Sequence, residues 1–133
     1  MKDDPDMKKK TPTTVGDILR INEAAFQSTV LEVARLYGWH VHHTRAVQIR
    51  PGRWATPLQG VAGFPDLVLA KSPTARSRGG VIFAELKTAT GRLSATQSEW
   101  ISRLDAGGAE VYVWRPRDIN FIRTRLEGKR LTR

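Results

Sequence analysis

Cysteine is absent from this chain of 133 residues. Its absence excludes a disulfide framework and a thiolate metal site, and is typical of proteins of the reducing cytoplasm. Long apolar runs are absent too. None approaches the ~20 residues that a membrane-spanning helix needs, and the charged first residues lead into no apolar signal-peptide core. We therefore expect a cytoplasmic protein with no membrane contact.

Acidic residues are scarce relative to basic ones. The chain has 22 Lys and Arg against 13 Asp and Glu, which gives a formal net charge of +9. Such an excess favours a polyanionic partner. We expect nucleic acid rather than a membrane surface, because no basic helix has a broad apolar face. The charge indicates a class of partner but no reaction.

Apolar residues make up 40% of the sequence, which at this length suffices for one domain with a substantial core. We predict a single domain over residues 15–133. Residues 1–14 mix aspartates with lysines and contain little that could be buried, so we predict a disordered arm there.

Hydrophobic spacing predicts an α/β fold. Apolar residues three and four apart predict helices that start at Asn22, Ser94 and Asp118 and stop near Gly38, Gly107 and Gly128. Short apolar runs predict strands over residues 39–44, 66–70, 81–87 and 109–114. Residues 66–87 form the pattern of an antiparallel hairpin, and the strand–helix–strand order of residues 81–114 predicts a parallel pair with a right-handed crossover. We therefore predict a mixed central sheet flanked by helices.

Polar residues stand at the open end of the predicted hairpin. Asp66 starts its first strand, and Glu85 and Lys87 finish the second, so antiparallel pairing brings the three together. Two carboxylates suit Mg²⁺, which can bind a scissile phosphate and lower the pKa of a bound water. An ammonium beside them can orient that water and offset charge on phosphorus. A surface ion pair among strand-end residues is the alternative.

The wider pattern resembles a known family. Gly63-Phe64-Pro65-Asp66 followed by Glu85-Leu86-Lys87 resembles the motif of the PD-(D/E)XK nuclease superfamily. The added Gln97 on the following helix, with Glu23 and Gln27 on the preceding one, resembles its VRR-NUC branch. Small stand-alone members of that branch, common in phages and bacteria, are similar in layout to Holliday junction resolvases. The resemblance spans residues 22–117, most of the chain.

This resemblance implies a restriction-endonuclease-like core and a metal-dependent endodeoxyribonuclease that acts on structured or branched DNA. It implies Mg²⁺ or Mn²⁺ as cofactor, and a homodimer, since two symmetric cuts on a junction need two active sites. The implied catalytic residues are Asp66, Glu85, Lys87, Glu23 and Gln97, and the implied metal ligands are Asp66, Glu85, Glu23 and the Leu86 carbonyl.

Local patterns offer structural explanations for two of these residues. Ser94 and Gln97 have the spacing of a capping box, which by itself accounts for Gln97. Glu23 stands in the first turn of its helix, where a carboxylate complements the helix dipole. Both interpretations of each residue stay open.

Several basic residues are candidate DNA contacts, and we predict that role for Arg45, Arg50, Arg53, Arg92 and His43. Residues 44–63 form a long connection with several arginines and Trp54, which is typical of a substrate-contacting flap; a solvated irregular loop is the alternative. From Arg115 onward, seven basic residues stand against two acidic ones, which fits either a DNA-facing surface or an ordinary solvated face.

Two other functions stay open. A non-catalytic nucleic-acid-binding module on the same fold would use the basic surface alone, but it has no reason to keep two acids where phosphate would lie. A restriction-type endonuclease that reads a short sequence is the second, although 133 residues leave little room for a separate recognition domain.

Overall fold

A four-stranded mixed sheet forms the centre of the molecule. The computed structural model describes residues 22–44, 47–55 and 60–130. Within them β1 (His40–His43), β4 (Leu67–Lys71), β5 (Gly80–Leu86) and β6 (Glu110–Trp114) lie in the order β1-β4-β5-β6. The pairs β1/β4 and β4/β5 are antiparallel and β5/β6 is parallel. The predicted α/β class, hairpin and parallel crossover are therefore confirmed.

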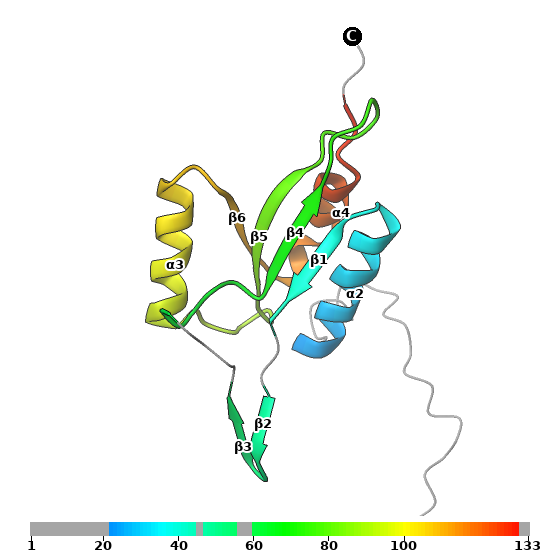
Figure 1. Cartoon of the computed structure of the whole chain (residues 1–133). Coiled ribbons are helices and arrows are strands. Elements are labelled where there is room, and N and C mark those ends of the chain that lie inside the picture. Colours follow the sequence, from blue (N-terminus) through cyan, green and yellow to red (C-terminus); the bar gives the residue numbers. More distant parts are fainter. Residues whose placement is uncertain (1–21, 45–46, 56–59, 131–133) are drawn as a thin grey trace, which may run out of the picture.

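Within the described residues, three helices flank this sheet. Figure 1 shows α2 (Glu23–Leu36) and α4 (Ile119–Glu127) on one side and α3 (Ala95–Ala106) on the other. The main core lies under α2 and α4, because alternate strand residues point that way and pack on the helices. Its fully buried members are Phe26, Val30, Ala34, Leu67, Leu69, Ile82, Ala84, Ile122 and Leu126. None of the helices in the described part of the chain combines the length and apolar character needed to cross a lipid bilayer.

The helix boundaries follow the predicted caps. The Asn22 side chain accepts a hydrogen bond from the Ala25 N–H at the start of α2, and Gly128 ends α4 in a left-handed conformation. Asp118 does precede α4, but its carboxylate accepts a bond from the Arg115 N–H instead of capping the helix. A short 3₁₀ turn, η1 (Pro116–Asp118), occupies this corner. The predicted arm over residues 1–14 lies outside the described residues.

The connection over residues 44–63, predicted to be a substrate-contacting flap or a solvated irregular loop, contains regular structure that was not predicted. It contains β2 (Val47–Arg50) and β3 (Arg53–Ala55), which pair antiparallel around Pro51 and Gly52. Figure 1 shows this small hairpin projecting from the body of the domain. The turn residues were visible in the sequence, but the runs beside them, of four and three residues, are too short to distinguish a strand from a loop.

The basic C-terminal segment is only partly a surface. Arg125 is buried and donates to both carboxylate oxygens of Glu110 and to the Gly79 carbonyl oxygen. Its guanidinium also lies 5.4 Å from the centre of the Trp39 ring. This arginine therefore joins α4 to the sheet, a role that neither earlier interpretation of the segment included.

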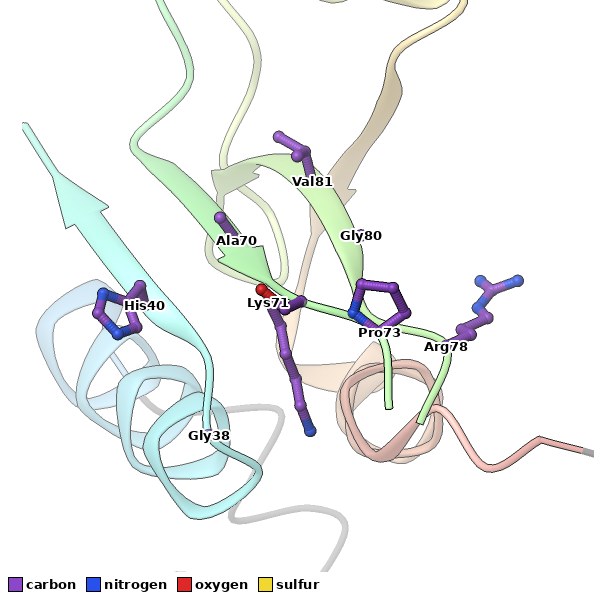
Figure 2. Close-up of a pocket in the computed structure, with 9 residues that line it drawn as sticks. Gly38, His40, Ala70, Lys71, Pro73, Arg78, Gly80 and Val81 are labelled. Atoms are coloured by element: carbon purple, nitrogen blue, oxygen red, sulfur yellow. The ribbon is translucent and has the colours of Figure 1, made fainter. Parts of the chain in front are cut away.

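The far end of the β4–β5 hairpin carries a hollow of about 790 Å³, shown in Figure 2. Gly38, His40, Ala70, Lys71 and Arg78 are among its lining residues. The Lys71 ammonium donates a hydrogen bond to the Tyr37 carbonyl oxygen, at the end of α2, at 2.6 Å. The hollow lies at the opposite end of the hairpin from Asp66 and Glu85.

Candidate active site

The register of the hairpin brings two carboxylates together. Leu67 pairs with Ala84, so Asp66 and Glu85 stand opposite each other just beyond that pair. Their positions are fixed by backbone hydrogen bonds. The Leu86 N–H donates to Oδ2 of Asp66 at 2.9 Å, and the Asp66 N–H donates to Oε2 of Glu85 at 3.3 Å. Each acid is thus held by the strand that bears the other.

Glu85 has an unusual environment for a carboxylate. It is only 2% exposed, although charged side chains are rarely buried to this extent without a partner. Burial raises the pKa of Glu85 to about 8, and the negative charge of Asp66 adds to the effect, while Lys87 opposes it. A second positive charge beside the pair would stabilise its ionised form.

Lys87 and Gln97 meet the same oxygen of Glu85. The Lys87 Nζ lies 3.7 Å from Oε1 of Glu85, and Nε2 of Gln97 donates to that oxygen at 2.9 Å. The structure therefore places two positively polarised groups, one from β5 and one from α3, beside the buried carboxylate.

Gln97 also completes the capping box of α3. The Gln97 side-chain Oε1 accepts a hydrogen bond from the Ser94 backbone N–H at 2.9 Å, and the Gln97 backbone N–H donates to the Ser94 Oγ at 3.2 Å. The amide oxygen thus belongs to the cap while the amide nitrogen faces Glu85. The predicted capping box is therefore confirmed, and the same side chain also contacts Glu85.

The segment from Gly63 to Asp66 fixes α3 against the sheet. A Cβ on Gly63, whose φ is +98°, would lie 2.5 Å from the Thr96 carbonyl carbon, so only glycine permits this approach. The Phe64 ring packs edge-to-face with Trp100 of α3 and with Phe83 of β5, with ring centroids 5.0 Å and 5.9 Å apart. These contacts hold the first turn of α3, and hence Gln97, close to Glu85.

For the two residues predicted from α2, Glu23 and Gln27, the described residues show no hydrogen bond or ion pair with the Asp66 or Glu85 carboxylate. Glu23 is exposed in the first turn of α2. Gln27 contacts the Nδ1 of His43 at 3.2 Å through its Nε2. His43 is half-buried on the α2 side of β1. Because strand side chains alternate, its exposed neighbour His42 lies on the other face of the sheet.

The predicted DNA-contacting arginines are placed only in part. Arg53 is exposed at the start of β3, and Arg92 is exposed on the loop between Lys87 and α3. Arg45 lies outside the described residues, and for Arg50 only the backbone, at the end of β2, is described.

One residue near the site was missed in the sequence. Arg115, directly after β6, donates to the carbonyl oxygens of Thr88 and Gly91 in the loop that follows Lys87. The only signal was its place after a strand parallel to the one that carries Lys87, which does not predict a side-chain contact.

The donor set fits a hard divalent cation. Asp66 and Glu85 supply carboxylate oxygens, the ligands that Mg²⁺ and Mn²⁺ prefer, and water with substrate phosphate commonly completes such a site. A cation would also neutralise the two adjacent carboxylates, whose mutual repulsion contributes to the high pKa of Glu85. No cluster of three or more His, Cys, Asp or Glu side chains suited to a metal occurs among residues 22–44, 47–55 and 60–130.

Comparison with known proteins bears on the family and the fold. No curated protein matches the chain. A solved structure named "VRR_NUC domain protein" shares its fold, with 23% sequence identity and a TM-score of 0.50 over 84% of this chain and 98% of the other. The family model of the VRR-NUC domain matches residues 42–118, more than half of the sequence, and this range includes Asp66, Glu85, Lys87 and Gln97. The chain therefore belongs to the VRR-NUC domain family of nucleases.

Proposed function

We propose that this protein is a metal-dependent endonuclease that hydrolyses phosphodiester bonds in structured or branched DNA, in the manner of a Holliday junction resolvase. The observation that carries the proposal is the buried Glu85 beside Asp66, with Lys87 and Gln97 at its Oε1. Burying Glu85 beside a second acid costs free energy, so a purely structural role leaves the arrangement unexplained.

Asp66 and Glu85 would hold Mg²⁺ or Mn²⁺, with the Leu86 carbonyl and Glu23 as the further ligands that the family resemblance implies. A cation bound there would act as a Lewis acid toward the scissile phosphate and lower the pKa of a bound water. Glu23 is exposed near the start of α2, so it would assist from the periphery.

Three side-chain or backbone groups would carry the remaining work. The Lys87 ammonium would orient the attacking water by hydrogen bonding and offset the charge that develops on phosphorus. Gln97 would hold Glu85 in place through its 2.9 Å hydrogen bond. The Leu86 N–H would do the same for Asp66. The water oxygen would form a bond to phosphorus as the bond from phosphorus to the leaving sugar oxygen breaks, and the proton lost by the water would be balanced by one taken up from solvent by the leaving oxygen.

Charge supports DNA as the substrate. The net charge of +9 suits a polyanion, and the exposed Arg53 and Arg92 would contact phosphate together with Arg45, Arg50 and His43. The preference for branched DNA and the homodimer come from the family resemblance, since a C2 dimer would present two active sites to the two strands of a junction.

Cleavage of a DNA panel tests the proposal. Four-way junction, flap, duplex and single-stranded DNA would be incubated with the protein in Mg²⁺ or in EDTA. We expect cleavage of branched DNA in Mg²⁺ and none in EDTA. Asp66→Ala and Lys87→Ala should abolish cleavage while leaving junction binding mostly intact.

Each other outcome has a defined meaning. Binding of all substrates with no cleavage under any metal would favour a non-catalytic binding module. Cleavage of duplex DNA at one short sequence would favour a restriction-type enzyme. Cleavage retained by purified Asp66→Ala would reject the assignment of the site.

A further inference from the structure

We infer that Arg115 is a positioning residue that fastens the loop between Lys87 and Gln97, and so sets the geometry around Glu85. The inference rests on the proposed function for its effect on cleavage, but the contact itself is independent of that function. Arg115 belongs to none of the residues that the family resemblance points to.

The end of β6 holds this loop at three points. The Lys87 N–H donates to the Trp114 carbonyl oxygen at 2.9 Å, which continues the parallel pairing of β5 and β6 by one bond. The next residue, Arg115, uses Nη1 to donate to the Thr88 carbonyl oxygen at 2.7 Å and to the Gly91 carbonyl oxygen at 2.6 Å. One side-chain nitrogen thereby closes the turn from Thr88 to Gly91.

The closed turn lies against the stem of Lys87. A Cβ on Gly91 would stand 3.6 Å from the Lys87 Cδ and 2.9 Å from the Thr88 Oγ1, so Gly91 approaches both closely. The Gly91 N–H also donates to that hydroxyl at 3.0 Å. Lys87 is left with a side chain only 17% exposed. A change in this turn would therefore alter the space available to the Lys87 side chain.

The same loop leads directly to the second group at Glu85. It continues through Arg92 to Ser94 and Gln97, the capping box of α3. Lys87 and Gln97 are thus separated by nine residues, the last two of which belong to α3, and both meet Oε1 of Glu85. Fastening Thr88 and Gly91, in the first half of this stretch, restrains the path of the chain from Lys87 toward Gln97.

The guanidinium suits this role for a chemical reason. The Nη1 of Arg115 carries two hydrogens in fixed directions, so it can donate to two carbonyl oxygens at once. The positive charge of the guanidinium strengthens both hydrogen bonds. A lysine at this position has a compact charge on a flexible stem and would restrain the turn less well. We therefore expect Arg115→Lys to be intermediate between the native residue and alanine.

Hydrogen–deuterium exchange combined with single-turnover cleavage tests the inference. In Arg115→Ala, exchange should rise in peptides that cover residues 88–93 and stay unchanged in β4. The single-turnover rate constant on a four-way junction in Mg²⁺ should fall about ten- to hundredfold, as small misplacements of catalytic groups do. The dissociation constant for the junction should change no more than in the charge-matched control Arg123→Ala, whose side chain is exposed on α4.

The outcomes separate the positioning role of Arg115 from the proposed nuclease function. Unchanged exchange over residues 88–93 in Arg115→Ala would overturn the inference whatever happens to cleavage. Equal loss of junction affinity and of rate, with native exchange, would make Arg115 a DNA contact and would overturn it too. If exchange rises in Arg115→Ala but the native protein cuts no DNA, the positioning role of Arg115 stands and the proposed nuclease activity is rejected. If Arg115→Ala does not fold, Arg115→Lys carries the same measurements.

Discussion

The side-chain amide of Gln97 joins the cap of α3 to the buried carboxylate of Glu85. Its nitrogen donates to Oε1 of Glu85 at 2.9 Å, while its oxygen accepts from the Ser94 N–H at 2.9 Å. A displacement of the N-terminus of α3 would therefore also displace the amide group that donates a hydrogen bond to Glu85. The fold and the site share this one side chain, and its two functions can be separated by substitution.

Ser94→Ala and Gln97→Ala should differ in their effect on catalysis. Ser94→Ala removes the cap hydroxyl and should lower the free energy of unfolding by about 1 kcal/mol, but it leaves the Gln97–Glu85 bond in place. Gln97→Ala also leaves Glu85 without that donor, and should cost about 1–3 kcal/mol. Only Gln97→Ala should reduce the cleavage rate in Mg²⁺. Equal rates for the two variants, corrected for folded fraction, would mean that Gln97 is only a cap.

The sequence could predict the position of the carboxylates because the hairpin leaves little freedom. Once two short apolar runs pair antiparallel, Asp66 must lie near Glu85, and the structure places them in opposite positions. The capping box of Ser94 and Gln97 was equally legible, since it depends on four consecutive residues. Its contact with Glu85 was not, because that contact depends on how closely α3 approaches the sheet.

Gly63→Ala should disturb the site through that approach. The new Cβ would lie 2.5 Å from the Thr96 backbone and would push the first turn of α3 away from Glu85. Gly60→Ala is a matched control, since Gly60 also has a positive φ, +115°, but no atom within 4 Å of the added carbon. We expect Gly60→Ala to cost about 1–2 kcal/mol of stability and Gly63→Ala clearly more, with a fall in cleavage rate. Similar stabilities by urea unfolding would show that the contact with α3 is unimportant.

Glu85 should make the metal-free protein less stable as pH rises. Its pKa is raised by burial from an ordinary value of 4.5 to about 8, so the folded protein keeps a proton that the unfolded chain releases. The free energy of unfolding contributed by this group is therefore highest below about pH 4.5, and it declines until the pH passes the folded pKa. Glu85→Gln resembles the protonated acid and lacks this decline.

The difference between Glu85→Gln and the native protein measures the effect. In EDTA the variant should gain stability relative to the native chain between about pH 5 and pH 8, by a few kcal/mol at most, since one pKa unit corresponds to about 1.4 kcal/mol. Mg²⁺ should reverse the order, because it binds the ionised carboxylates of the native protein. A stability difference that does not vary with pH would exclude the raised pKa.

Exposed arginines should contribute to affinity and not to the chemical step. Arg53→Ala and Arg92→Ala should each weaken junction binding and reduce the slope of log affinity against log salt by about one. Their single-turnover rates at saturating protein should stay close to native. Arg103→Ala is a suitable control, because this exposed residue on α3 forms a local ion pair with Glu99. An unchanged salt slope for either variant would remove that arginine from the DNA-binding surface.

Side-chain contacts with backbone oxygens lay beyond the sequence. Arg115 and Arg125 belong to one basic segment, yet Arg115 donates to the loop after Lys87 and Arg125 is buried against Glu110 and Gly79. Charge counting treats both as surface residues. Their carbonyl partners are set by the paths of distant loops, for which local spacing carries no signal. The β2–β3 hairpin was missed for a different reason, since its two strands are only four and three residues long, too short for a strand pattern to stand out.

Crystallography with Mn²⁺ tests the central claim most directly. An anomalous difference map from crystals grown with Mn²⁺ should show one strong peak between the carboxylates of Asp66 and Glu85, and the peak should be lost in Asp66→Asn. No ion between these carboxylates, or a peak confined to other residues, would contradict the account.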